Sequence, residues 1–413
     1  MKNWILTLFI ASYSVCSFAQ FDNTVYSDWT TGYSVGTFGR YQASTNAITT
    51  NLLWKGYQGK FLDRDLRKKV SGLHGKSNRL GADLDYGIYA RHIPDSTKGI
   101  GWFINVADRT HINARYPKHL FDLAMFGNAM FAGESAVLAP IDINLFMYTQ
   151  YEVGILKTIA RPKGKWNIGF GVSLLTGKKN LSLSIEQADL YTDPDGEYLD
   201  GEIHGNLKSS SLASSQYFDA NGIGFSTSLH VAYSSGKFGI RFEADDIGLF
   251  SWSKGLKETD LDSVFRFEGV DVNLFSADGG AFSSINLDSV VNGFATQIVG
   301  SSYSTMLAGR IGFEGDYQLN AKNWKLYAGV QYRIAPGFIP YAYIGTNSPL
   351  GKGFSIDGRV AFGGFGSWHL GLEVKKKFAD IVQIRVGTRN LEGYVLPMIG
   401  TSQSAYIGIS AFF

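Results

Sequence analysis

The chain has 413 residues, and its 38 Lys and Arg against 36 Asp and Glu give a formal net charge of +2, so charge indicates no nucleic-acid partner. Although hydrophobic residues make up 45% of the chain, no window approaches the roughly 18 consecutive apolar residues of a membrane-spanning helix. The composition combines 49 Gly, 29 Phe, 22 Tyr and 8 Trp with only 9 Pro and 1 Cys. This combination favours many strands that are apolar on one side only.

Residues 1–19 have the organisation of a signal peptide. A basic residue precedes the apolar run 4–11, and 17–19 supplies small residues at both positions that signal peptidase reads. Cleavage after this segment would remove Cys16, so the exported chain, 20–413, is expected to form one domain without disulfides. A lipoprotein anchor at Cys16 is the weaker alternative, because the residue before it is not small.

Two-residue alternation dominates the chain from Arg79 to the C-terminus. In the segment 165–174 the even positions are apolar and the odd positions are small or polar. The segment 324–334 also has its apolar residues mainly at even positions, whereas in 221–233 they stand at odd positions. Each run has about the 9 to 11 residues that a tilted strand needs to cross a bilayer, and aromatic residues often stand at its ends. The pattern predicts a transmembrane β-barrel; a soluble two-layer β domain is the alternative.

The alternation predicts sixteen strands, of which the first two are the least regular, so fourteen is the other expected number. The final strand is expected to pair with the first, because lipid offers no hydrogen bonds to a free edge. In chain order the predicted strands are 31–40, 47–56, 79–91, 98–109, 145–160, 165–177, 179–190, 221–234, 237–249, 306–319, 324–333, 337–346, 353–363, 367–377, 381–389 and 403–413.

The polar face of these strands carries charges of both signs, which are predicted to line the lumen. His230 and His369 fall on the same face and are expected to have a structural role there. The charged positions are Asp83, Asp85, Arg91, Arg241, Glu243, Arg310, Glu314, Asp316, Arg333, Asp357, Arg359, Glu373, Lys375, Arg385 and Arg389.

Four long segments interrupt the strands. Strand counting from a periplasmic C-terminus predicts extracellular loops at 191–220 and 251–305, and periplasmic or luminal insertions at 57–78 and 110–144. Within these insertions, apolar residues spaced by four among many Lys and Arg predict a short basic amphipathic helix at 61–70, and 120–131 is a candidate for a second.

No motif indicates an enzyme, and no catalytic, cofactor-binding or metal-binding residues are predicted. The sequence lacks a nucleophile elbow, a zinc-protease motif and a phosphate loop, and its 7 histidines are scattered. The segment 191–202 matches a calcium loop in part, but Tyr191 stands where the first Asp ligand belongs. A turn at Pro194-Asp195-Gly196 is the preferred interpretation, with calcium binding as the alternative.

Several segments together resemble a family of Bacteroidota outer-membrane β-barrels of unknown function. They are the basic helix, the run 80–89, Gly-Ile-Gly-Trp at 99–102, the glycines between 127 and 133, and 267–271. The resemblance covers most of the mature chain and implies an outer-membrane barrel. A more distant likeness is to fatty-acid-uptake barrels, which have fourteen strands and an N-terminal plug. No residue matches that plug, so no functional residue is carried over.

Two functions are therefore considered for a barrel in the outer membrane of a Gram-negative bacterium. The first is binding or passage of a small molecule through the lumen, a hydrophobic one if Tyr89, Phe103 and Tyr327 face inward as predicted. The second is a structural or scaffolding role, without transport, in an envelope assembly or secretion machine. The expected partners are the lipid bilayer and either the small molecule or an envelope protein.

Overall fold

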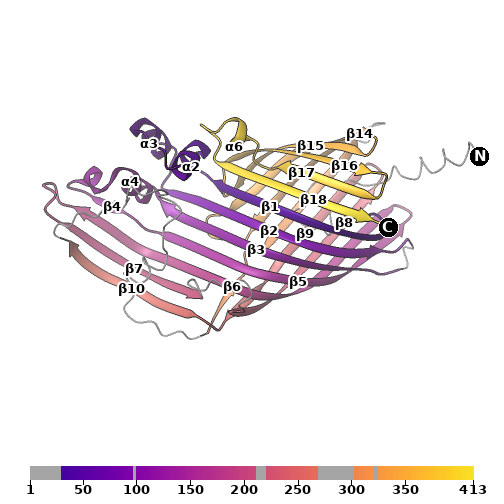
Figure 1. The fold of residues 1–413 in the computed structure, drawn as a ribbon, viewed down its shortest axis with the longest axis horizontal. Coiled ribbons are helices and arrows are strands. Elements are labelled where there is room, and N and C mark those ends of the chain that lie inside the picture. The colour runs from indigo at the N-terminus through magenta and orange to yellow at the C-terminus, as the bar shows by residue number, and fades with distance from the viewer. Residues whose placement is uncertain (1–28, 96–98, 211–219, 268–301, 320–323) are drawn as a thin grey trace, which may run out of the picture.

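The computed structural model describes residues 29–95, 99–210, 220–267, 302–319 and 324–413. The predicted signal peptide, with Cys16, lies outside the described residues. The strands of the described chain form one antiparallel sheet that closes on itself (Figure 1). Among these residues, no helix has both the length and the apolar character needed to cross a membrane.

Eighteen described strands form this sheet; four lie outside the ring, and the other fourteen make the closed wall. β18 pairs with β1 from Phe412↔Ser34 to Ser402↔Ser44, which closes the ring. The predicted fold class and the pairing of last and first strands are confirmed. Around the ring the strands are β1 (Gly32–Thr45), β2 (Ser77–Ile93), β3 (Gly101–Pro117), β5 (Ile141–Arg161), β6 (Gly164–Thr192), β8 (Gly222–Ser235), β9 (Phe238–Trp252), β12 (Arg310–Leu319), β13 (Trp324–Arg333), β14 (Ile339–Gly351), β15 (Phe354–Gly364), β16 (Trp368–Phe378), β17 (Val382–Thr388) and β18 (Ser402–Phe412).

Two corrections account for the difference between sixteen expected strands and fourteen. The predicted strand 47–56 is largely a helix, α2 (Thr50–Tyr57), whose first amide groups donate to carbonyls of the 397–400 segment. The predicted pair 165–177 and 179–190 is one strand, β6, because Lys178 forms a bulge while its two neighbours stay paired with β5.

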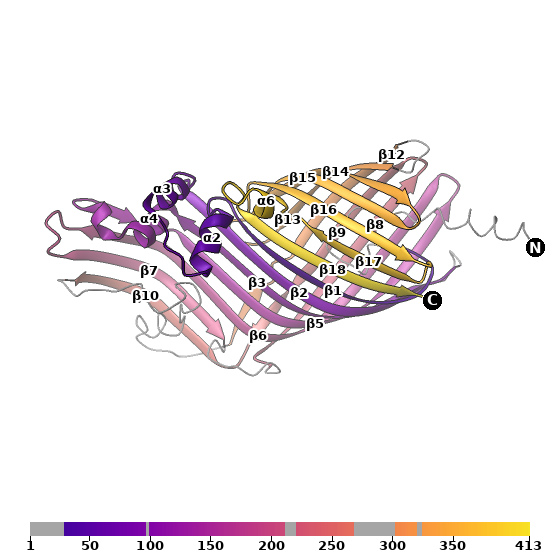
Figure 2. The same cartoon turned by 45° about the horizontal axis from the view of Figure 1, so that its top comes forward.

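β6 is long enough, at 29 residues, to leave the wall and continue beyond it. Its far half pairs with β7 (Leu199–Ser210), and β7 pairs with β10 (Leu256–Phe267). β4 (Ser135–Val137) pairs with the end of β6. We call β7, β10 and the far half of β6 the projecting sheet, which extends past the ring in Figures 1 and 2. The fourth extra strand, β11 (Tyr303–Met306), pairs with the end of β9.

Short helices cover one end of the barrel. α3 (Arg64–Ser71) confirms the predicted basic helix, and α4 (Lys118–Phe126) with the 3-10 helix η1 (Asn128–Phe131) occupies the second predicted position. α6 (Glu392–Val395) lies between β17 and β18. α2, α3 and α4 are joined by a hydrophobic cluster of Leu52, Leu66, Val70, Tyr116 and Phe121.

All four long segments lie at the same end of the barrel in their described parts (Figure 2). We call this the helical end; the other end holds Gly32, Phe413 and short turns such as that between β8 and β9. The expectation that 57–78 and 110–144 lie opposite 191–220 and 251–305 is therefore wrong. Splitting β6 into two strands reversed the predicted direction of the strands 79–91, 98–109 and 145–160.

Candidate functional site in the lumen

The two faces of the wall differ as the alternation predicted. On β8, Ile223 and Phe225 point outward and are 56% and 64% exposed, whereas Ser226, Ser228 and His230 point inward and are at most 5% exposed. The same division runs around the ring, so the outside is a continuous apolar belt. A belt of this size on an isolated chain is suited to lipid, not to water.

The inward face is polar and densely charged. The predicted lumen charges that are buried include Asp85, Arg91, Arg241, Glu243, Arg310, Glu314, Arg333, Asp357, Arg359, Glu373 and Arg385. His230 and His369 are buried with them, as predicted. Burying charge without a partner is costly, and most of these groups have an opposite charge nearby. Arg385, for example, donates to Glu373 at 3.1 Å.

Some ion pairs join strands on different sides of the ring. Arg333 of β13 donates to both carboxylate oxygens of Asp83 on β2 at 2.9 Å. Arg109 of β3 pairs with Asp246 of β9 at 3.4 Å, and Gln150 of β5 donates to the same carboxylate at 3.0 Å. Two cavities among these groups have volumes of about 20 and 40 Å³. The ion pairs narrow the lumen at this level.

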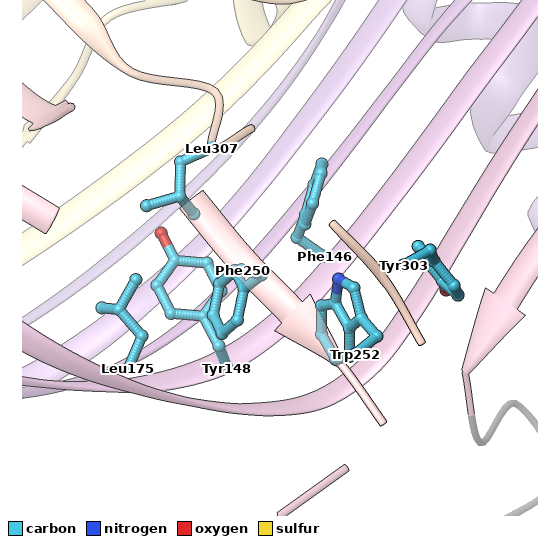
Figure 3. Close-up of a cluster of buried hydrophobic side chains, with 7 residues drawn as sticks. All are labelled: Phe146, Tyr148, Leu175, Phe250, Trp252, Tyr303 and Leu307. Atoms are coloured by element: carbon cyan, nitrogen blue, oxygen red, sulfur yellow. The ribbon is translucent and has the colours of Figure 1, made fainter. Parts of the chain in front are cut away.

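An aromatic cluster lies inside the wall toward the helical end (Figure 3). Phe250 stacks on Trp252 with ring centroids 4.8 Å apart, and Tyr148 meets Phe250 edge-on at 5.3 Å. Trp252 donates from Nε1 to Thr305 Oγ1 at 2.8 Å, which ties the cluster to β11. The members, contributed by β5, β6, β9, β11 and the segment after β11, are Phe146, Tyr148, Leu175, Phe250, Trp252, Tyr303 and Leu307.

A cavity of about 490 Å³ lies beside this cluster, within the size range of small-molecule sites. Some lining residues, such as Phe146 and Asn113, are buried in the lumen, whereas Met306, Tyr332 and Ile334 are 67%, 44% and 40% exposed. We call it the rim cavity. Its lining is Asn113, Asn144, Phe146, Ser182, Thr305, Met306, Ala308, Tyr332, Ile334, Ala335 and Pro336.

Strand lengths explain why the rim cavity reaches the outer face. β11 pairs with β9, and no described strand pairs with its other edge. β13 stops at Arg333, so the wall is lower there than at β5 and β6. We call the low part of the wall between β11 and the end of β13 the notch. Met306 on β11 and Tyr332 near the end of β13 lie on its two sides. The cavity thus has both lumen-facing and outward-facing walls.

The aromatic residues predicted to face inward do so, but they do not line the rim cavity. Tyr89 and Phe103 share a cluster with Ile93 and Leu156. Tyr327 packs with other tyrosines from β14. Sequence reasoning missed the rim cavity because 303–305, most of β11, was assigned to the loop 251–305. The notch also depends on where neighbouring strands stop, which no local pattern records.

The predicted turn in the partial calcium motif is confirmed. Asp193 Oδ2 accepts hydrogen bonds from the backbone N–H groups of Asp195 and Glu197 at 3.0 and 3.2 Å, and Gly196 has a φ of 75°. Arg266 donates twice to Asp200, at 2.7 Å each, and these hydrogen bonds hold the pKa of that carboxyl below its ordinary value. Both carboxylates thus have partners within the projecting sheet and its turn.

Comparison with known proteins places this barrel in a family. The chain belongs to the family described as "Family of unknown function (DUF5723)". The match covers residues 34–384, so the predicted resemblance to a barrel family of unknown function is confirmed. No curated protein matches the chain.

Several solved barrels are similar at low sequence identity. A deletion mutant of the TodX monoaromatic hydrocarbon channel is 7% identical, with 93% of this chain and 91% of that chain covered and a TM-score of 0.42. A Pseudomonas aeruginosa FadL homologue is 8% identical, with 92% and 90% covered and a TM-score of 0.40. The translocator domain of the autotransporter NalP from Neisseria meningitidis is 11% identical, with 93% and 89% covered and a TM-score of 0.33.

Proposed function

We propose that this protein is an outer-membrane β-barrel that binds a small, largely apolar molecule in the rim cavity and exchanges it through the notch. The observation that carries the proposal is the 490 Å³ cavity, which has both lumen-facing and outward-facing walls. The apolar belt supports residence in a bilayer. With the C-terminus on the periplasmic side, the helical end and its four long segments face outside the cell.

The lining suggests the chemistry of the ligand. Phe146, Met306 and Ile334 offer apolar contacts, whereas Asn113 and Asn144 offer amide groups on the lumen side. A molecule with an apolar body and one hydrogen-bonding group, such as a medium-chain alcohol, suits this division. The ion pairs across the middle of the lumen favour binding at the rim over free axial diffusion.

Photoaffinity labelling of the full chain in detergent tests this function. The probe is a ten-carbon alcohol with a diazirine group, and the readout is labelling of the peptides that contain 303–309 and 332–336. We expect saturable labelling that excess 1-decanol competes away. Ala308→Trp, which fills the cavity, should reduce this labelling at least several-fold. Ala328→Trp is the matched control, because Ala328 is exposed on the outward face. Labelling that decanol does not compete, or that A308W leaves unchanged, would contradict the proposal.

A scaffolding role is the second candidate, and the projecting sheet favours it. β7 and β10 lie beyond the ring and add nothing to barrel closure (Figure 1). In this case, crosslinking in intact cells should join one envelope protein to β10 reproducibly, and the rim cavity should show no competed labelling. The two candidate functions therefore predict opposite results in the labelling experiment.

A further inference from the structure

Three potential metal ligands meet on the lumen face of one hairpin. His230 of β8 pairs directly with Glu243 of β9, and Asp245 lies two residues further along β9 on the same face. Their exposed fractions are 3%, 0% and 2%. One ligand atom from each lies within 4.8 Å of the others, and His230 Nε2 is 2.8 Å from Glu243 Oε2.

The carboxylates of this group lack hydrogen-bond donors. Within the described residues, all four carboxylate oxygens of Glu243 and Asp245 are buried, and none accepts a hydrogen bond of suitable geometry from a nitrogen donor. The two carboxyl groups lie within hydrogen-bonding reach of each other. Arg310 forms an ion pair with Asp245, with Nη2 3.5 Å from Oδ2. Buried carboxylate oxygens are almost always satisfied by a donor or a cation. Four such atoms beside one imidazole therefore point to a ligand.

The charge of the surroundings points the same way. The four carboxylates in this region are those of Glu243, Asp245, Glu314 and Glu152. Two guanidinium groups lie beside them: that of Arg241 is 3.7 Å from Glu314, and that of Arg310 is 3.5 Å from Asp245. The fourth carboxylate, Glu152, interacts with Asp245 and accepts hydrogen bonds from uncharged Ser228 and Asn105 side chains. With every carboxyl group ionised and a neutral imidazole, two negative charges remain. One divalent cation balances them; the alternative is two bound protons.

We propose that His230, Glu243 and Asp245 bind a divalent transition-metal ion that bridges β8 and β9 inside the lumen. An imidazole nitrogen with two carboxylates suits Zn²⁺, Mn²⁺ or Fe²⁺ better than Ca²⁺ or Mg²⁺, which prefer oxygen ligands alone. Two donor atoms on one ion lie at most about 4.2 Å apart, twice a bond of about 2.1 Å. Small side-chain rotations bring the three ligands within that limit. Gly312, opposite Glu243 on β12, presents no side chain to the site.

Metal analysis of the full chain tests the site. The detergent-purified protein is stripped with a chelator, incubated with Zn²⁺, Mn²⁺ or Ca²⁺, and desalted. The metal content is then measured by mass spectrometry. We expect about one equivalent of Zn²⁺ or Mn²⁺ per chain and no retained Ca²⁺. Glu243→Gln with Asp245→Asn should lose at least nine-tenths of the bound metal. His111→Gln is the matched control, because it alters another buried lumen histidine that pairs with a carboxylate, Asp83.

A second measurement uses the zinc-loaded wild-type protein, so its main result does not depend on how a variant folds. X-ray absorption of the zinc-loaded wild-type protein should show a first shell of oxygen and nitrogen, with an imidazole contribution that His230→Gln removes. Failure of the folded wild-type protein to retain any transition metal would overturn the proposal in favour of two bound protons. Retention of the metal by the E243Q/D245N variant would overturn it as well, because the ion would then bind elsewhere. Either result leaves the rim-cavity proposal untouched, since that rests on labelling of other residues.

Discussion

At the scale of single residues, His74, just after α3, contacts both β3 and α4. Its Nδ1–H donates to the Val70 carbonyl at 2.8 Å, and its Nε2 is 3.2 Å from the Tyr116 hydroxyl. The ring stacks on Phe121 with centroids 4.0 Å apart. Burial lowers the pKa of His74 below its ordinary value, because the charged imidazolium would lose water.

This lowered pKa predicts that acid loosens the helical cluster. Above about pH 6.5, the ordinary histidine pKa, His74 is neutral in both the folded and the unfolded state. Burying its ring then requires no loss of a proton. Below that pH the unfolded segment binds a proton first, and stability falls as the pH approaches the lowered pKa of the folded state. Hydrogen exchange of residues 64–76 should therefore accelerate by up to roughly tenfold per pH unit in that window, after correction for intrinsic rates. His74→Gln should abolish this dependence; an equal acceleration in H74Q would disprove it.

At the scale of elements, His204 links the two outer strands of the projecting sheet. Its Nε2 is 2.8 Å from Glu202 on the same strand, and its Nδ1 is 2.9 Å from Asp262 on β10. The Glu202 hydrogen bond, followed by the charge of Asp262, raises the pKa of His204 above its ordinary value. Both ring nitrogens can donate only in the protonated imidazole.

The raised pKa predicts the opposite pH dependence for this sheet. The contribution of His204 is complete below the unfolded pKa of about 6.5 and disappears as the pH rises through the higher folded pKa. Amide exchange of β10 should therefore speed up, relative to intrinsic rates, as the pH rises above about 6.5 and through the raised pKa of His204. His204→Lys keeps the positive charge and should flatten this response. A wild-type sheet with constant protection over the range would show that the two ion pairs contribute nothing.

The elements that the sequence predicted correctly are those with uninterrupted alternation. The hairpin of β8 and β9 formed as expected, because apolar and polar positions alternate up to its tight turn. The prediction split strand β6 at Lys178, the one residue between 165–177 and 179–190. In the fold, Lys178 bulges out of the ladder and pairs with Asp108, so the strand continues. Because this ion pair joins residues 70 positions apart, no local sequence pattern reveals it.

In the candidate sites too, contacts within one hairpin follow from the local sequence, whereas contacts across the lumen do not. Tight-turn geometry pairs His230 with Glu243, so the hairpin alone could have placed the proposed metal ligands together. The prediction of no metal site considered spacing along one strand only. Contacts across the lumen, such as that of Arg333 with Asp83, depend on the number of strands in the ring. The sequence left that number open, and the rim cavity depends on it too.

At the scale of the whole molecule, two features bear on whether ions can pass: the strand pairing around the ring and the ion pairs across its lumen. The pairing of β1 with β18 closes the wall of described strands, and ion pairs such as that of Arg333 with Asp83 cross the lumen. We expect these ion pairs to block the passage of a hydrated ion. The purified barrel should therefore insert into planar bilayers without steady conductance. Regular single-channel steps from the wild-type protein would show that the ion pairs separate in the membrane.

The last prediction concerns the apolar belt. If lipid covers the belt, a charged substitution there lowers stability by an amount that depends on its depth in the bilayer. Ile344 is 53% exposed and points outward at the middle of β14, where Ala328 of β13 and Val360 of β15 pair with it. Ile344→Arg would place a charge deep in hydrocarbon and should lower the free energy of unfolding in liposomes by about 2–4 kcal/mol. Phe61, 82% exposed and outside the ring, is the matched control. Phe61→Arg should leave urea unfolding nearly unchanged. Equal effects of the two substitutions would mean that water, not lipid, covers the belt.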